Sequence, residues 1–88
     1  MISKTLTIIN KLGLHARASS KLVSLANQYQ SKVTIEKDGQ TANAKSLMTV
    51  MMLSASFGSH ITISTDGADE VVALEALANL IQNKFGEE

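Results

Sequence analysis

The stretch KVTIEKDGQTAN, residues 32–43, decides the fold because it predicts two neighbouring antiparallel strands. Val33 and Ile35 alternate with polar residues, which is the period-two pattern of a half-buried strand. The Asp38-Gly39 pair that follows tolerates the positive φ angles of a tight hairpin turn. We therefore expect a hairpin whose second strand is short and lies near residues 40–43.

Two further strands are expected on either side of this hairpin. Over residues 2–8 the apolar side chains of Ile2, Leu6 and Ile8 share one parity, and threonines occupy the other. Residues 60–65 alternate in the same way before an Asp-Gly turn. Each of these strands should bury one face and leave the other in water.

Helical periodicity appears in the segments that lie between and after the strands. The segment 16–29 repeats apolar residues at spacings of three and four, namely Ala18, Leu22, Leu25, Ala26 and Tyr29. A shorter helix is expected over residues 47–53, with the Ser46 side chain capping its first amides.

The last helix is expected to be long, to be capped by Asp69 and to end at Gly86. Its apolar stripe consists of Val71, Leu74, Leu77, Ala78, Ile81 and Phe85. The element order is therefore strand, helix, strand, strand, helix, strand, helix. Amphipathic helices need a sheet face to cover, so we predict a single α+β domain over residues 1–88, with three helices on one face of a four-stranded antiparallel sheet.

Composition excludes several classes of function. Eight basic and eight acidic residues cancel, so no overall field attracts nucleic acid or anionic lipid, and three aromatic residues are too few for a base-stacking platform. The chain lacks cysteine, and polar residues interrupt its amino-terminal segment, so neither thiolate metal sites nor membrane insertion is expected. His60 has no ligand partner at a useful spacing and is interpreted as structural. We expect a cytoplasmic monomer without a metal.

Residues 13–17, Gly-Leu-His-Ala-Arg, lie where a loop gives way to the first helix. Unpaired amides and the helix dipole favour an anion there, and Arg17 can grip phosphate oxygens with two hydrogen bonds. The neutral ring of His15 offers a nucleophilic nitrogen at cellular pH. A histidine at a helix start can equally be a cap or a surface residue, and the motif alone leaves both interpretations open.

Together with residues 44–48, Ala-Lys-Ser-Leu-Met, this motif resembles the HPr family of the bacterial phosphotransferase system, in its proteobacterial form, almost from end to end. The resemblance implies an open-faced β-sandwich fold and a phosphoryl group carried on the pros nitrogen of His15, with Arg17 touching the phosphate. It implies enzyme I as donor, IIA proteins or domains as acceptors, and no cofactor. Such a chain is a carrier intermediate rather than a free-standing enzyme.

The resemblance also suggests regulation and a docking surface. Ser46 is a possible target of HPr kinase/phosphorylase, in addition to its expected capping role. The two helices around the motif would bind partners through Ala16, Ser20, Lys21, Leu47, Met48, Met51 and Met52, although a solvated face and core packing are the simpler explanations of these residues. On the short helix, Val50 and Leu53 with part of Met51 should face the sheet, whereas Leu47, Met48 and Met52 should be more exposed around His15.

One residue departs from the family pattern, because most members have proline where this chain has Ala18. Alanine still allows the helix to start but leaves an amide donor and a less rigid loop. Two alternatives to a sugar-branch carrier also stay open. One is the nitrogen-branch regulatory paralogue, which uses the same histidine, and the other is an interaction module that never carries phosphate. Intact His15 and Arg17 speak against the second.

Overall fold

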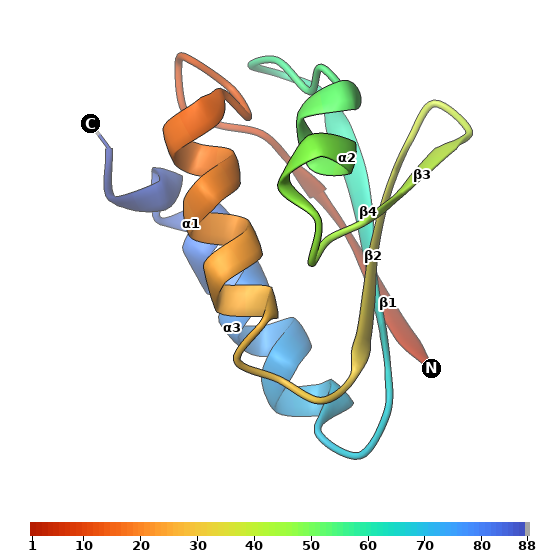
Figure 1. Ribbon diagram of the computed structural model, residues 1–88. Coiled ribbons are helices and arrows are strands. Elements are labelled where there is room, and N and C mark those ends of the chain that lie inside the picture. Colours follow the sequence, from red (N-terminus) through yellow and green to blue (C-terminus); the bar gives the residue numbers. More distant parts are fainter. Residues whose placement is uncertain (88) are drawn as a thin grey trace.

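A four-stranded antiparallel sheet with the strand order β1-β4-β2-β3 is the framework of the computed structural model, which describes residues 1–87 (Figure 1). The strands are β1 (Ile2–Thr7), β2 (Lys32–Lys37), β3 (Gln40–Asn43) and β4 (His60–Asp66). The helices are α1 (Ala16–Ala26), α2 (Leu47–Met52) and α3 (Glu70–Gln82), followed by a 3-10 turn at Lys84–Gly86. The predicted element order and the α+β class are confirmed.

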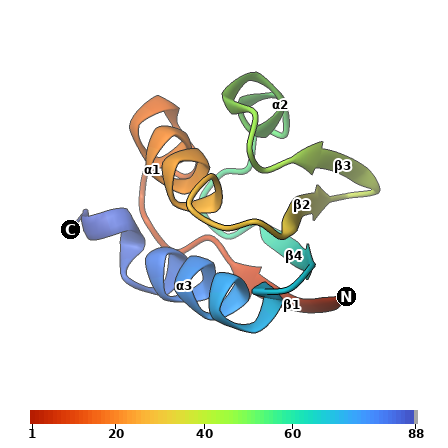
Figure 2. The same cartoon turned by 60° about the horizontal axis from the view of Figure 1, so that its bottom comes forward.

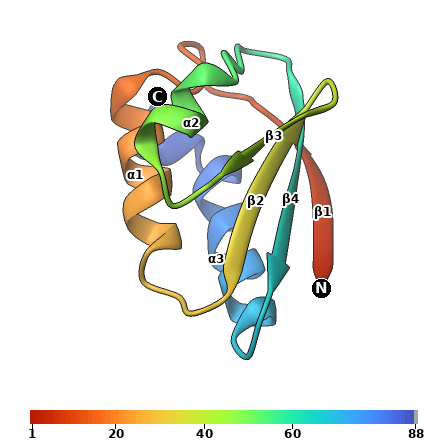
Figure 3. The same ribbon diagram turned by 45° about the vertical axis from the view of Figure 1, so that its right-hand side comes forward.

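All three helices lie on the same side of the sheet, so the other face is open (Figure 3). Strand alternation sends the side chains of Leu6, Val33, Ile35, Ile61 and Ile63 into the core beneath the helices. The opposite parity carries polar groups, as between β1 and β4, where the hydroxyls of Thr5 and Thr62 lie 3.0 Å apart. The prediction of one buried and one wet face is therefore confirmed.

The β2-β3 hairpin turns at the predicted place. Asp38 and Gly39 have φ angles of 51° and 84°, and Lys37 pairs with Gln40 directly across the turn. Two successive positive φ angles match the right-handed twist of the flanking strands, which fixes the register of the hairpin. That register places Ile35 opposite Ala42, and both side chains are buried.

The two expected helix caps are wrong in detail. Ser46 and Asp69 do precede α2 and α3, but neither side chain makes a capping hydrogen bond. Near the start of α2, the Thr49 hydroxyl shares its one hydrogen between the carbonyl oxygens of Asn43 (2.8 Å) and Ser46 (3.0 Å). The Asp69 carboxylate accepts from the Ser31 hydroxyl and from the amides of Gln30 and Ser31, which lowers the pKa of Asp69. Long-range bonds to the α1-β2 loop thus replace the local cap.

Both long helices are shorter than the periodicity predicts. Helix α1 ends at Ala26, so Tyr29 lies in the following turn, and α3 ends at Gln82 rather than at Gly86. Val71 does not belong to the buried stripe, because it is 56% exposed. Phe85 is buried, yet it enters the core from the 3-10 turn, where its φ angle is 56°. This turn bends the end of the chain back beside α1 (Figure 1).

Helix α1 lies between the other two helices and contacts both α2 and α3, and α2 also lies against β3 (Figure 2). Within residues 1–87, no helix is long and apolar enough to cross a membrane, and no group of histidine and carboxylate side chains is arranged to hold a metal ion. His60 starts β4 at the surface, where its Nδ1 lies 3.0 Å from the Thr7 hydroxyl. That contact agrees with a structural role for His60.

Candidate functional site

His15 is the residue immediately before α1, and its backbone is extended with φ −76° and ψ 179°. The loop that leads to it is fixed at several points. The Leu14 amide donates to the carbonyl oxygen of Ala55 (2.8 Å), and the Leu14 carbonyl accepts from the Ser19 hydroxyl (3.0 Å). Leu14 itself is buried. The backbone that carries His15 is therefore held to both α1 and the segment after α2.

Gly13 allows this loop to approach the neighbouring segment closely. Its φ angle is 66°, and a Cβ atom built on it would lie 2.6 Å from the Ala55 carbonyl oxygen and 2.8 Å from Ser56 Cα. Both contacts are with backbone atoms, which cannot rotate away. Only glycine fits this position without a shift of one segment or the other.

The first turn of α1 presents donors without acceptors. Ser19 is the first residue whose amide closes the helix, onto the His15 carbonyl at 2.8 Å. Among residues 1–87, the amides of Ala16, Arg17 and Ala18 have no hydrogen-bond partner. No acidic residue stands in this turn to neutralise them. An anion beside His15 would therefore meet amide donors and the positive end of the helix dipole.

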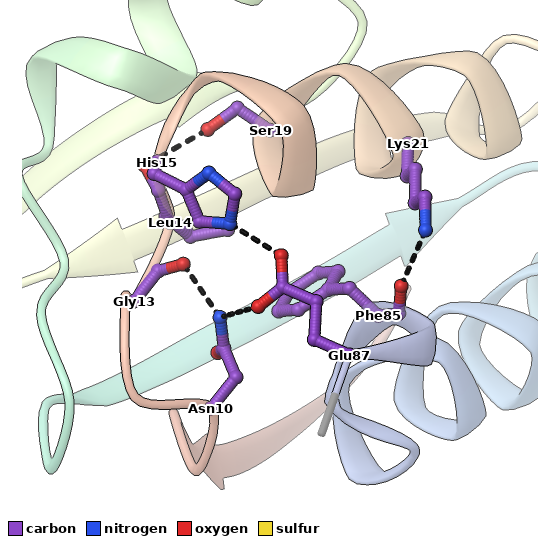
Figure 4. Close-up of polar contacts among 8 residues, drawn as sticks. All are labelled: Asn10, Gly13, Leu14, His15, Ser19, Lys21, Phe85 and Glu87. Carbon is purple, nitrogen blue, oxygen red and sulfur yellow. Dashed lines mark hydrogen bonds and ion pairs between the residues drawn. The ribbon is translucent and has the colours of Figure 1, made fainter.

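The His15 ring is reachable and oriented (Figure 4). Its side chain is 27% exposed, and Nε2 is hydrogen-bonded to Oε2 of Glu87. The other ring nitrogen, Nδ1, points away from Glu87 in this view and has no hydrogen-bond partner among the described residues. The nitrogen that the resemblance assigns as the acceptor is thus the one left open.

Glu87 and Asn10 complete the site, and neither was identified from the sequence. The second Glu87 oxygen, Oε1, accepts from Asn10 Nδ2 at 2.9 Å, and the same Nδ2 donates to the Gly13 carbonyl at 2.8 Å. These donors, Asn10 first and His15 second, lower the pKa of Glu87. The carboxylate is therefore ionised at neutral pH, as a partner of an imidazole N–H should be.

Arg17 is exposed on α1 and belongs to none of the ion pairs formed among residues 1–87. A shallow open hollow lies beside the ring of His15, and it is lined by Lys11, Leu12, His15, Ala16, Arg17 and Glu87. The structure thus brings together the two residues on which the sequence motif depends. A guanidinium that forms no ion pair among residues 1–87 and lines the same hollow as His15 is suited to hold phosphate oxygens there.

The expected partner surface is only partly free. Ala16 and Ser20 are exposed, but Lys21 Nζ donates to the Phe85 carbonyl at 2.7 Å, which ties this cation to the end of the chain. On α2 the predicted exposure is confirmed for five residues, because Val50 and Leu53 are buried while Leu47, Met48 and Met52 are exposed. Met51, which was expected to face the sheet in part, is 39% exposed. Met52, however, lines a separate hollow with Gln40 and Thr41 of β3, so part of it faces β3.

Comparisons with known proteins identify the class. A family model described as the PTS HPr component phosphorylation site matches residues 2–83. The phosphocarrier protein HPr of Cupriavidus necator is 54% identical over 87 residues, which cover 99% of this chain and 98% of the relative. The phosphocarrier protein NPr of Shewanella violacea is less similar, at 40% identity over 98% of this chain and 94% of the relative.

Solved structures agree with the sequence relatives. The crystal structure of HPr-C-His from Thermoanaerobacter tengcongensis superposes with a TM-score of 0.97 at 44% identity, covering 100% of this chain and 99% of the other. An HPr from Bacillus anthracis superposes with a TM-score of 0.89 at 46% identity, covering 92% of this chain and 96% of the other. The chain therefore belongs to the HPr family, the phosphocarriers of the phosphotransferase system. Family membership implies enzyme I and IIA proteins as its general partners.

The departure at Ala18 leads to a prediction. The Ala18 amide has no acceptor among residues 1–87, so replacing it with proline loses no hydrogen bond within them. Proline also restricts the unfolded chain, and we expect Ala18→Pro to stabilise the protein by roughly 0.4 to 1 kcal/mol in urea unfolding. Ala18 is fully buried, so a marked loss of stability would mean that its surroundings leave no room for the ring.

Proposed function

We propose that His15 is the phosphoryl acceptor and that Nδ1 carries the group. The observation that supports this most is the state of the ring, because Nε2 is hydrogen-bonded to Glu87 while Nδ1 is open. The three residues that follow His15 carry the free amides of the first turn of α1, and the second of them, Arg17, also carries the guanidinium. A phosphoryl dianion on Nδ1 would thus be formed near neutral amide donors and one cationic side chain.

The reaction requires little covalent chemistry from this chain. The Nδ1 lone pair attacks the phosphorus atom of the donor's phosphoryl group, and the new P–N bond forms while the bond to the donor breaks. Such transfer depends mainly on in-line positioning and on neutralising the charge of the oxygens. The hydrogen-bonded loop and the start of α1 supply the first, and the amides with Arg17 supply the second.

We propose enzyme I, charged by phosphoenolpyruvate, as the donor. Incubation with phosphoenolpyruvate, magnesium and purified enzyme I should produce a phosphoimidazole signal in the phosphorus NMR spectrum. Addition of a IIA protein should then transfer the phosphoryl group to the IIA protein, so that the signal of this chain disappears. A chain that stays unphosphorylated with an enzyme I that is active on another HPr would contradict the proposal.

Arg17→Ala provides a test of the second site residue. We expect it to slow acceptance from enzyme I by roughly 10- to 100-fold, because a charge-assisted bond to the phosphoryl oxygens is lost. Folding stability should change by only a few tenths of a kcal/mol, since the side chain is exposed and unpaired among residues 1–87. Lys32→Ala, which removes an exposed cation from β2, is the control. Equal rates for the two variants would remove Arg17 from the site.

We propose that the acceptors dock on α1 and α2, through Ala16, Ser20, Leu47, Met48 and the neighbouring side chains. Helix α2 packs beside α1, and its exposed methionines suit a surface that must fit several partners. The sugar branch is the favoured one, since relatives called HPr reach 54% identity and the NPr relative 40%. The monomer is the proposed working form, and the cytoplasm the proposed location.

Ser46 is a second proposed phosphorylation site, for HPr kinase/phosphorylase. Its side chain is half-buried at the start of α2, and its hydroxyl has no capping bond to give up. A phosphate dianion there would add negative charge next to the proposed docking surface and so disfavour acidic partners. Incubation with a purified kinase of this type and ATP, with Ser46→Ala as control, tests the proposal, and label that persists in Ser46→Ala would contradict it.

A further inference from the structure

The segment after α3 folds back toward α1 and places Glu87 beside His15. Its backbone adopts left-handed conformations at Lys84 and Phe85, both with φ 56°, and at Gly86 with φ 77°. Left-handed non-glycine residues are costly and persist only where the surroundings determine them. Here the Phe85 side chain is buried in the core, and its carbonyl accepts from Lys21 Nζ at 2.7 Å. This turn places the next residue, Glu87, against the imidazole of His15.

Both carboxylate oxygens of Glu87 are hydrogen-bonded at that point. Oε2 is bonded to His15 Nε2, and Oε1 is held by Asn10, which is itself fully buried and bonded to the Gly13 carbonyl. Both Glu87 and His15 are mostly covered, with side-chain exposures of 18% and 27%. The carboxylate is therefore attached to the same loop that carries His15, and not to the ring alone (Figure 4).

We propose that Glu87 is a positioning residue for phosphoryl transfer, which keeps the proton of the His15 ring on Nε2 and stabilises the positive charge that the ring gains when Nδ1 is phosphorylated. This inference rests on the proposed role of His15. A carboxylate at Nε2 requires a hydrogen there, so the lone pair of the neutral ring is on Nδ1. The tautomer that can attack phosphorus is thus selected before any donor arrives.

The same contact makes the transfer reversible without moving a proton. When Nδ1 forms the P–N bond, the ring keeps its Nε2 hydrogen and becomes cationic, and the Glu87 carboxylate lies against that charge. When the P–N bond breaks toward an acceptor, its electron pair returns to Nδ1 and the neutral Nε2–H ring is restored. Charge develops in the transition state next to a fixed anion, which lowers the barrier in both directions.

The test is the substitution Glu87→Gln, with Glu75→Gln as the matched control. Glu75 is an exposed carboxylate on α3, so its replacement removes the same charge away from the ring. Glu87→Gln should fold, because Phe85 and Lys21 still hold the segment. We expect kcat for acceptance from enzyme I to fall by roughly 10- to 100-fold in Glu87→Gln, with KM nearly unchanged, and both to stay at the wild-type values in Glu75→Gln.

A second readout is independent of phosphorylation. NMR of the labelled imidazole nitrogens at a pH where the ring is neutral should show His15 almost wholly as the Nε2–H tautomer in the wild type and as a mixture in Glu87→Gln. Unchanged tautomer populations, or a rise in KM with kcat preserved, would overturn the positioning role, the latter because it indicates a partner contact. Since this measurement needs no donor, a failure of the phosphocarrier assignment at His15 is distinguishable from a failure of this inference.

Discussion

His15→Ala is expected to abolish phosphorylation by enzyme I. The chain has two histidines, and the structure distinguishes them clearly. His15 stands at the start of α1 beside free amides, whereas His60 lies at the start of β4 with its Nδ1 3.0 Å from the Thr7 hydroxyl. Removing the proposed nucleophile leaves no other imidazole at the helix start that could carry the phosphoryl group. No phosphoimidazole signal should appear after prolonged incubation.

His60→Ala is the matched control for that experiment. It removes the other imidazole and one surface hydrogen bond, so it should be phosphorylated at the wild-type rate. Both variants should melt as cooperatively as the wild type, which separates loss of the acceptor from loss of the fold. A phosphoimidazole signal in His15→Ala that disappears in His60→Ala would transfer the assignment to the other histidine.

Gly13→Ala is expected to have the largest effect on stability. A side chain at φ 66° costs about 1 to 2 kcal/mol, and the added Cβ would lie 2.6 Å from the Ala55 carbonyl oxygen. Forcing the two backbone segments apart costs about 1 to 3 kcal/mol more. We therefore expect the free energy of unfolding, measured in urea, to fall by roughly 2 to 5 kcal/mol. Since the His15 loop must shift, acceptance from enzyme I should slow as well.

Gly39→Ala separates the two causes. Gly39 has a similar φ of 84°, but a Cβ on it would meet no atom within 4 Å. Its replacement should therefore cost only the backbone term of about 1 to 2 kcal/mol and leave phosphorylation unchanged. An equal loss of stability in both variants would show that the close approach of Gly13 to Ala55 has no energetic weight.

The fold could be predicted from the sequence where local patterns decide it. The alternation of Val33 and Ile35 and the Asp38-Gly39 turn gave the hairpin, because strand burial and turn conformation are both short-range properties. The ends of the helices were less predictable. Phe85 keeps the helical spacing of α3 and is buried, yet a left-handed turn carries it there after the helix has ended at Gln82.

The predicted capping hydrogen bonds were wrong for a related reason. Ser46 and Asp69 occupy the positions that precede helices, and a serine or aspartate there commonly bonds the first amides. The Asp69 carboxylate instead bonds the α1-β2 loop, nearly forty residues away along the chain. Tertiary donors competed with the local ones, and no short-range pattern reveals that competition.

The candidate site, too, could be predicted only in part from the sequence. His15 and Arg17 were found because they share a short motif at a helix start. Glu87 was missed because it is separated from His15 by 72 residues and follows an expected helix end, where a solvated carboxylate is the ordinary interpretation. Asn10 was missed because a single asparagine between a strand and a helix matches no motif, although it is fully buried and holds both Glu87 and Gly13. Only the path of the chain after α3 brings these groups together.

The most direct test is to phosphorylate the protein with labelled imidazole nitrogens and to determine by NMR which nitrogen is bonded to phosphorus. We predict coupling of phosphorus to Nδ1 of His15 and a retained hydrogen on Nε2. Coupling to Nε2, or phosphorus on any other side chain, would contradict the account, because that nitrogen is the one that Glu87 occupies.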